Sequence, residues 1–325
     1  MKTVEIRAND AGQRLDRFLK KYLKKAPLSA IYKIIRKDLK LNGKRAGENT
    51  VLKEGDELSF YMSDERFEEL TGPVRSRRAK KQFRVAYEDR HVLIVEKPWG
   101  LLTHGDSVEK KNTLMNQVCG YLQDKGEFNP AKEKTFTPSP VNRLDRNTTG
   151  LVIFGKSSES LRHLTALIRS RDAVSKYYIT IVAGDFAEEM TIEASLEKNE
   201  KTNTVRVSSD GQYAKSIARP FERSSDGKFS LVEVELFTGR THQIRTHLAS
   251  AGYPLAGDSK YGTSAKGRRA NEHLRKLGVT TQLLHAYRLK FENPGEEYGT
   301  LAGLDGRQVV AEIPGEFERV WKELK

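Results

Sequence analysis

Residues 141–150, VNRLDRNTTG, lead directly into a short apolar run, LVIF at residues 151–154. An apolar run of this length is typical of a buried strand, so Asp145 is expected in the loop just before one. Arg143 and Arg146 flank Asp145, and opposite charge nearby favours the ionised form of a carboxyl group. An ionised Asp can act as a nucleophile or a base. For these residues taken alone, an ion pair within a loop is the alternative interpretation.

The composition predicts folded domains that bind a polyanion. The chain has 325 residues, enough for two domains, and 57 Lys and Arg against 44 Asp and Glu residues give a net charge of +13. A basic excess of this size favours nucleic acid as the partner over a membrane surface. The apolar runs are short and regular, which argues against disorder.

The sequence has no feature of a disulfide-bonded or membrane-spanning protein. Cys119 is the only cysteine, which excludes an intrachain disulfide and zinc sites that need two thiolates. No run approaches the roughly 18 apolar residues of a transmembrane helix. Charged residues interrupt the N-terminal segment, so no signal peptide is expected. We therefore expect a cytoplasmic protein without a membrane partner.

Residues 1–62 are predicted to form a small basic domain. Apolar residues recur at helical spacing over residues 15–23 and 31–39, and Asn42-Gly43 suits a type I′ hairpin turn. With 15 Lys and Arg against 8 Asp and Glu residues, the segment has a net charge of +7, which favours phosphate binding over general solubility. The candidate RNA contacts are basic residues of the second helix and of the turn: Lys33, Arg36, Lys37, Lys44 and Arg45.

Residues 63–84 lack periodicity and are predicted to be a linker. Basic residues gather toward its end: Arg75, Arg77, Arg78, Lys80, Lys81 and Arg84. Such a charge run is usually a solvated tether. Between two basic domains it can equally contact RNA phosphate, and both interpretations remain open.

Residues 85–325 predict an α+β domain. Apolar and β-branched runs indicate strands at residues 92–95, 151–154, 176–182, 229–236 and 283–291. Residues 184–216 are expected to be rich in hairpins, and helices are expected over residues 158–168 and 242–248. Few strand–helix–strand crossovers are evident, so the sheet should be mixed and largely antiparallel.

Several common catalytic motifs are missing. His242 and His247 are five residues apart, so they do not share a helix face, and no His-Glu-x-x-His sequence occurs. No metal site is therefore expected. The sequence has no phosphate-cradling glycine-rich loop, which argues against a nucleotide cofactor. It also has no G-x-S-x-G element of a serine hydrolase.

A series of motifs, in order along the chain, resembles those of a known enzyme family. They are KPWGL at residues 97–101 with His104, NRLD at 142–145 followed by TGL at 149–151, KYY at 176–178, TGRTHQIR at 238–245, GD at 257–258 and LLHA at 283–286. Over roughly residues 85–320 this set resembles the pseudouridine synthase family that includes the RluA, RluC and RluD enzymes. Residues 14–16, RLD, and 39–44, LKLNGK, resemble the small RNA-binding module of the ribosomal-protein S-four type.

The resemblance implies a pseudouridine synthase fold and an isomerase that converts uridine in RNA to its C-glycoside without a cofactor. It implies that Asp145 is the catalytic aspartate, acting as a nucleophile or a base. Tyr178 would stack on the flipped base and assist proton transfer at C5, and Arg245 would pair with Asp145 and orient it. A base inside a stack must be extruded before it reacts, and an aromatic platform with cations suits that step.

The resemblance also implies roles near these residues. Arg143 would help to open the duplex or hold the substrate, while Arg240 and His242 would either contact the substrate or hold their own loop. Two positions depart from the usual pattern. Asn142 stands where the family usually has His, and Thr149 stands where Ser is more usual.

Ribosomal RNA is the expected substrate, because an RNA-binding module is fused to the N-terminus. Transfer RNA is the alternative substrate, and the protein is expected to act as a monomer. A non-catalytic RNA-binding factor for ribosome assembly is the competing hypothesis, against which the retained Asp145, Tyr178 and Arg245 argue.

Overall fold

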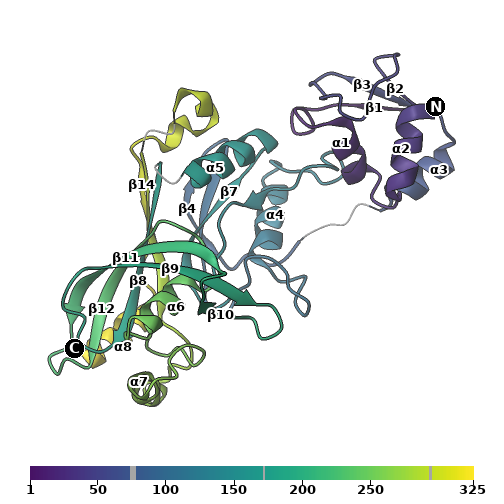
Figure 1. Ribbon diagram of the computed structural model, residues 1–325. Helices are drawn as coiled ribbons and strands as arrows, with labels where there is room; N and C mark the ends of the chain where they lie inside the picture. Colours follow the sequence, from purple (N-terminus) through teal and green to yellow (C-terminus); the bar gives the residue numbers. More distant parts are fainter. Residues whose placement is uncertain (74–77, 171–172, 293–294) are drawn as a thin grey trace. The chain divides into compact units, whose positions relative to one another are not determined.

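The computed structural model describes residues 1–73, 78–170, 173–292 and 295–325, which form two compact units (Figure 1). The first unit contains Met1–Lys81, Met115–Ser139 and Gly155–Arg162. The second contains Gln82–Leu114, Pro140–Phe154 and His163–Lys325. Within the basic cluster of the expected linker, Arg75 and Arg77 lie outside the described residues.

The first unit begins with a three-stranded antiparallel sheet and three helices. The strand order is β1 (Lys2–Glu5), β3 (Glu57–Phe60), β2 (Leu39–Leu41). The helices are α1 (Leu15–Tyr22), α2 (Leu28–Lys37) and α3 (Asp64–Thr71). Apolar residues at helical spacing on α1 and α2, among them Phe18 and Ile34, are fully buried in one core, as the sequence pattern predicts.

Helix α3 corrects the expectation of a linker that begins at residue 63. Ser63 caps this helix by accepting a hydrogen bond from the backbone N–H of Arg66. Phe67 is 4% exposed and packs edge-on against Phe60, with ring centroids 5.0 Å apart. A single buried aromatic residue on a short, acidic helix leaves little hydrophobic periodicity in the sequence, which is why the segment resembles a tether. The other proposed boundary, at residue 84, stays a prediction.

Asn42 and Gly43 form the predicted tight turn. Their φ angles are 50° and 75°, the left-handed values that a type I′ turn requires. Leu41 and Lys44 exchange two backbone hydrogen bonds, of 2.8 and 2.9 Å, across it. The hairpin is only this one residue pair long, because β2 pairs with β3 instead.

Polar contacts tie later segments of the chain into the first unit. Asn9 donates to Glu133 at 2.5 Å, and Gln13 donates to Thr135 at 3.2 Å. Asn9 also accepts from the backbone and the hydroxyl of Ser158, at 2.9 and 2.6 Å. These partners are more than 120 residues apart in the sequence, so local patterns give no sign that residues beyond 84 join this unit.

The second unit is built on a sheet of eleven strands within the described ranges. Their order along the sheet is β10 (Thr204–Val207), β9 (Met190–Asn199), β11 (Gln212–Arg223), β12 (Phe229–Leu236), β8 (Val174–Ala183), β13 (Leu284–Phe291), β7 (Thr149–Gly155), β5 (Val92–Lys97) and β4 (Arg84–Glu88). Strand β14 (Gln308–Val310) pairs with β13, and β6 (Ser139–Pro140) pairs with β7. The β13–β7 pair is parallel, whereas β8, β9, β11 and β12 run antiparallel to their neighbours. The predicted mixed, largely antiparallel sheet is thus confirmed.

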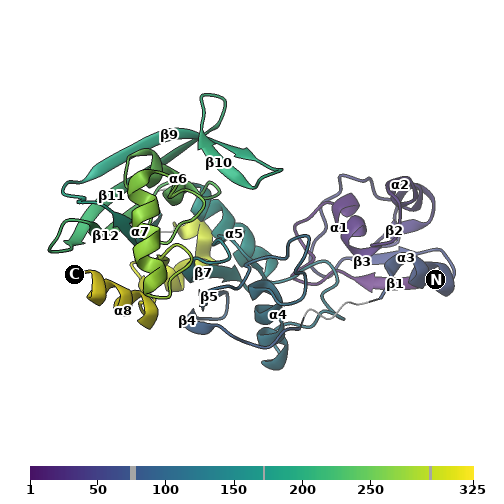
Figure 2. The same ribbon diagram turned by 90° about the horizontal axis from the view of Figure 1, so that it is seen from below.

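Helices α6 (Gln243–Ser250), α7 (Ala265–Lys276) and α8 (Gly315–Leu324) and the 3-10 segment Glu296–Leu304 belong to the second unit. The residues of α4 (Leu114–Asp124) and α5 (Ser158–Ser170) are divided between the two units. Figures 1 and 2 both show α6 beside the β9–β10 hairpin. Helices α7 and α8 pack against Ile179 and Ile181 of β8 in a second core. No helix in the described part of the chain combines the length and apolarity needed to cross a membrane.

Gly150 fixes the start of β7 against β13. Its φ angle is 111°, and a Cβ atom at this position would lie 2.1 Å from the carbonyl oxygen of Ala286. Only glycine therefore allows the two backbones to approach this closely. The approach holds β7 in place five residues after Asp145, so the loop that carries Asp145 ends on a fixed strand.

Candidate active site

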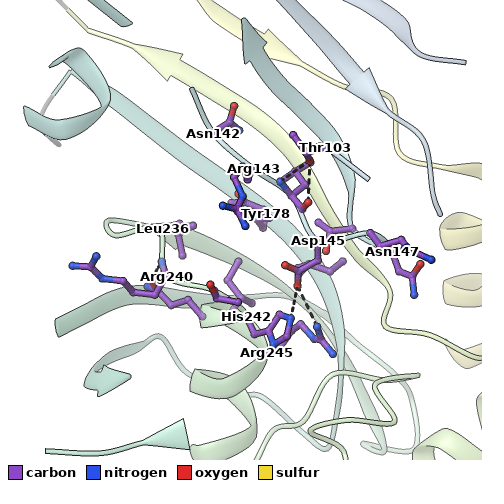
Figure 3. Close-up of a pocket in the computed structure, with 18 of the residues that line it drawn as sticks. Thr103, Asn142, Arg143, Asp145, Asn147, Tyr178, Leu236, Arg240, His242 and Arg245 are labelled. Atoms are coloured by element: carbon purple, nitrogen blue, oxygen red, sulfur yellow. Dashed lines mark hydrogen bonds and ion pairs between the residues drawn. The ribbon is translucent and has the colours of Figure 1, made fainter. Parts of the chain in front are cut away.

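The predicted site residues of the second unit line one cavity of about 1100 Å³ (Figure 3). Its walls include four loops that are far apart in the sequence: residues 102–106, 140–148, 236–245 and 258–260. Strand β8 adds Tyr178. The cavity thus brings together Asp145, Tyr178, Arg245, Arg143, Arg240 and His242.

Arg245 binds two carboxylates at once. Its Nη1 donates to Asp145 Oδ2 at 3.1 Å, so the expected contact between these two residues is present (Figure 3). Its Nε and Nη2 donate to the two oxygens of Asp258, at 2.7 and 3.0 Å. Burial opposes the charge on Arg245, but the hydrogen bonds and charge of Asp258, reinforced by Asp145, raise the pKa of Arg245 above its usual value. Asp258 was missed as a site residue, although it belongs to the GD motif.

Tyr178 presents a protonated phenol to the cavity. The residue is 7% exposed and lies on β8 between Val234 of β12 and Ala286 of β13. Burial, followed by the charge of Asp145, raises the pKa of Tyr178 far above its usual value. At neutral pH its side chain can therefore stack or donate a hydrogen bond, but it does not carry a charge.

His242 joins the Asp145 site to Tyr261. The residue precedes α6 with a left-handed φ of 51°, and its Nδ1 lies 2.7 Å from the Tyr261 hydroxyl. Its Nε2 lies 3.8 Å from Asp145 Oδ2. Burial lowers the pKa of His242, although the charge of Asp145 acts in the opposite direction. These contacts support the loop-holding interpretation of His242 and also place it beside the carboxylate.

Arg143 and Arg240 differ in their surroundings. The Arg143 side chain is exposed at the cavity. Arg240 donates through Nε to the carbonyl of Tyr213 at 3.1 Å and through its backbone N–H to Gln243 at 3.0 Å. Figure 3 shows the Arg240 side chain extending away from Asp145. These contacts, which tie the Arg240 side chain to β11, support the structural role over substrate contact, and both roles stay predictions.

Comparison with known proteins decides the family. Residues 91–250 match the family model described as RNA pseudouridylate synthase. The ribosomal large subunit pseudouridine synthase C of Vibrio parahaemolyticus is 33% identical over 90% of this chain and 89% of its own length. The enzyme of the same name from Escherichia coli is 34% identical over 91% of this chain and 90% of its own. The chain belongs to the RNA pseudouridylate synthase family.

As a pseudouridylate synthase, the protein is an isomerase that acts on RNA. A solved structure, human RNA pseudouridylate synthase domain containing 4, has a related fold with a TM-score of 0.54. It is 22% identical in sequence and covers 74% of this chain and 92% of its own. The predicted pseudouridine synthase fold is confirmed.

Lys97 and Thr103 hold the pseudouridylate synthase loop on both sides of Asp145. The Thr103 hydroxyl donates to the carbonyl of Leu144 at 3.0 Å and accepts from its N–H at 3.2 Å. Lys97 Nζ donates to the carbonyl of Arg146 at 2.9 Å. Both neighbours of Asp145 in the sequence are therefore fixed by side chains, one from Lys97 at the end of β5 and one from Thr103 in the segment that follows it.

Lys97 is a buried cation that sequence reasoning missed as a site residue. It is 1% exposed, and Nζ also donates to the carbonyls of Pro98 and Leu101, at 3.1 and 2.7 Å. Burial lowers the pKa of Lys97 to about 7, and the charge of Asp145 acts in the opposite direction. The signal in the sequence is a lysine that ends a buried strand directly before proline.

Asn142, which departs from the usual family pattern, bonds to the backbone of β7. Its amide nitrogen donates to the carbonyl of Leu151 at 3.1 Å, and its oxygen accepts from the N–H of Ile153 at 2.8 Å. Figure 3 shows Asn142 separated from Asp145 in the cavity wall. Thr149, the second departure, contacts His285 Nδ1 through its hydroxyl at 2.7 Å. The two departures thus make contacts within the sheet, Asn142 with β7 and Thr149 with β13.

The five basic residues predicted in the N-terminal segment belong to the first unit. Their side chains are all exposed: Lys33, Arg36 and Lys37 on α2, and Lys44 and Arg45 at and after the turn. Arg36 Nε donates to the carbonyl of Tyr32 at 3.2 Å. These residues do not line the cavity that contains Asp145.

Proposed function

We propose that the protein isomerises specific uridines of large-subunit ribosomal RNA to pseudouridine, with Asp145 as the catalytic residue. The observation that carries this proposal is the setting of Asp145. Its carboxylate is 29% exposed in the cavity and is held by an arginine that is only 8% exposed. The related synthases of Vibrio parahaemolyticus and Escherichia coli, named for the ribosomal large subunit, support the choice of RNA.

The contacts of Asp145 favour one oxygen as the reacting atom. Arg245 and His242 both approach Oδ2. We infer that Oδ1 faces the sugar, where it acts as a nucleophile or a base. In the reaction the bond from C1′ to N1 of uracil breaks and a bond from C1′ to C5 forms, while C5 loses a proton and N1 gains one. Every atom is conserved and nothing is oxidised, so the reaction needs no cofactor.

Other groups of the cavity suit a base that has left its stack. Tyr178 offers an uncharged ring for stacking, and its phenol, which burial keeps protonated, can assist at C5 as a relay that gives up its own proton as it takes one. Arg143 and Lys260 line the cavity and suit contact with RNA phosphate. A uridine must be extruded from paired or stacked RNA to reach Asp145, a step that enzymes acting on bases commonly use.

Features of the first unit are evidence that the RNA substrate extends beyond the target nucleotide. Residues 1–62 carry a net charge of +7, and the basic side chains of α2 and of the turn are exposed. We propose that these side chains bind phosphate outside the target nucleotide. A monomer suffices for this function because one chain supplies every site residue. A ribosomal substrate would place the activity in the cytoplasm.

Asp145→Asn tests the proposal. The variant keeps the shape of the side chain but removes its charge, so pseudouridine formation is expected to disappear while RNA binding persists. Unmodified large-subunit ribosomal RNA, transcribed in vitro, is treated with each protein and mapped for pseudouridine. RNA binding is measured on the same samples.

Full activity of Asp145→Asn contradicts the catalytic assignment. Unmodified transfer RNA, treated in parallel, tests the alternative substrate: pseudouridine there and none in ribosomal RNA contradicts the proposed target. No pseudouridine in either RNA, together with RNA binding, favours the non-catalytic assembly factor.

A further inference from the structure

Trp99 is an exposed aromatic residue next to the active site. The chain has two tryptophans, and the other, Trp321, is 7% exposed within a core. Trp99 is 58% exposed and lies on the short loop that follows β5. Large apolar rings on a surface often mark a binding site. Trp99 has no part in the contacts that hold Asp145.

The Trp99 ring is fixed although it is exposed. Its Nε1 donates to the Thr281 hydroxyl at 3.0 Å. Lys97 Nζ binds the carbonyls of Pro98 and Leu101, on either side of the Trp99-Gly100 dipeptide. Ordering a mobile side chain on binding costs conformational entropy. A ring held in this way offers its face to a ligand with little further ordering.

The same contacts place Trp99 at the rim of the cavity. Thr281, its hydrogen-bond partner, is a cavity-lining residue. Lys97, which holds its loop, also binds the carbonyl of Arg146, directly after Asp145. Trp99 does not line the cavity. Its position therefore suits a group that remains outside while another group enters.

We propose that Trp99 stacks on an unpaired base of the substrate RNA next to the target uridine. This inference rests on the proposed function. The indole N–H already has a partner, which leaves the ring face for contact, and a ring face stacks on any base. Trp99 would thus anchor the strand at the rim while the uridine enters the cavity, without selecting a sequence. It is a substrate-binding residue and takes no part in the chemistry.

Kinetics of Trp99→Ala and Trp99→Phe test the stacking. Trp99→Ala is expected to raise KM for the transcribed ribosomal RNA about tenfold, the size of one lost stacking contact, with kcat close to wild type. Trp99→Phe keeps an aromatic ring, so its KM is expected to lie between those of the wild type and Trp99→Ala. Thr281→Val, which removes the acceptor of the indole N–H, is expected to raise KM by less than Trp99→Ala. A wild-type KM in Trp99→Ala overturns the proposal.

Fluorescence gives a second readout that does not depend on turnover. Acrylamide quenches an exposed tryptophan, so in the wild type it reports on Trp99. Saturating poly(U), with binding followed in the same samples, is expected to shield Trp99 from the quencher. In Trp99→Phe only the buried Trp321 remains, and poly(U) should change nothing.

The two readouts separate this inference from the proposed function. Bound poly(U) that leaves Trp99 fully quenchable overturns the stacking proposal, even if the wild type forms pseudouridine. If poly(U) shields Trp99 but the protein forms no pseudouridine in any RNA, the stacking contact is supported and the proposed reaction is refuted.

Discussion

At the scale of single residues, Arg245 decides how Asp145 is presented. Three of its guanidinium contacts are divided unequally: two go to Asp258 and one goes to Asp145. Asp258 is only 1% exposed, so the bidentate pair is shielded from solvent. One N–H of Nη1 is therefore aimed at Asp145 by a residue on a different loop. Asp258 acts as a positioning residue for the proposed catalytic carboxylate.

Asp258→Asn is predicted to impair both stability and turnover. The change removes the bidentate partner of the buried Arg245 and leaves it only the contact with the partly exposed Asp145, which costs about 3 kcal/mol of unfolding free energy. Because Arg245 is then free to bind Asp145 in other geometries, kcat should fall about tenfold or more, while KM for RNA should change little. Denaturant unfolding and steady-state kinetics measure the two effects.

Asp185→Asn is the matched control for this change. Asp185 pairs with Arg223 at 3.1 Å, but the two side chains are 52% and 53% exposed. An exposed pair contributes about 0–1 kcal/mol, so this variant should resemble the wild type. If Asp258→Asn has the same kcat as Asp185→Asn, the positioning role of Asp258 is refuted.

At the scale of elements, buried histidines join segments on which the site depends. His247 of α6 contacts the Ser216 hydroxyl of β11 at 2.7 Å, and His285 of β13 contacts that of Thr149 at 2.7 Å. Burial lowers the pKa of each histidine to about 4. In the unfolded chain each titrates near 6.5, so between these pH values the unfolded state binds more protons. The free energy of unfolding should therefore decrease as pH falls from 6.5 toward 4.

His247→Asn is predicted to remove part of this pH dependence. Asparagine can keep a hydrogen bond to Ser216 but does not titrate. Between about pH 7 and about pH 5, the wild type should lose about 2 kcal/mol of unfolding free energy through His247, and the variant should not. Denaturant unfolding at the two pH values gives the difference.

The exposed residue His273 supplies the comparison for that experiment. His273→Asn should retain the wild-type loss of stability on acidification. An equal pH dependence in His247→Asn and the wild type shows that burial of His247 does not contribute to it.

At the scale of the whole molecule, basic charge is concentrated in the first unit. Residues 1–62 hold +7 of the net charge of +13. Replacing Lys33, Arg36 and Lys37 on α2 by Gln is predicted to weaken RNA binding and to flatten its salt dependence. Each lost phosphate contact lowers the slope of log K against log salt by about 0.7–0.9, so the loss for three contacts is about 2. Binding titrations over a range of salt concentrations measure this slope.

Three exposed cations of α8 and the C-terminus provide the matched variant: Arg319, Lys322 and Lys325, also changed to Gln. Both triple variants lose the same formal charge. If RNA binding responds only to net charge, the two slopes change equally, and the specific role proposed for α2 is wrong.

Much of the fold is readable in the sequence because it depends on near neighbours. The run at residues 151–154 predicts β7, and Asn42-Gly43 predicts its turn from the positive φ angles that these residues tolerate. Helix α3 is not predicted by such patterns, because its one buried aromatic residue, Phe67, gives no hydrophobic periodicity. The hydrogen bond from Ser158 to Asn9 is not predicted either, because a contact between residues 149 positions apart leaves no local pattern in the sequence.

The sequence by itself determined the family motifs, their order, and the presence of Asp145, Tyr178 and Arg245 on a basic chain. Only the tertiary structure decided which groups hold them: Asp258 behind Arg245, and Lys97 and Thr103 on either side of Asp145. The physical reason is the short range of these interactions. A hydrogen bond forms only when its two atoms lie within a few tenths of an ångström of the ideal separation. Strands and loops that are far apart in the sequence bring these atoms together only in the folded sheet.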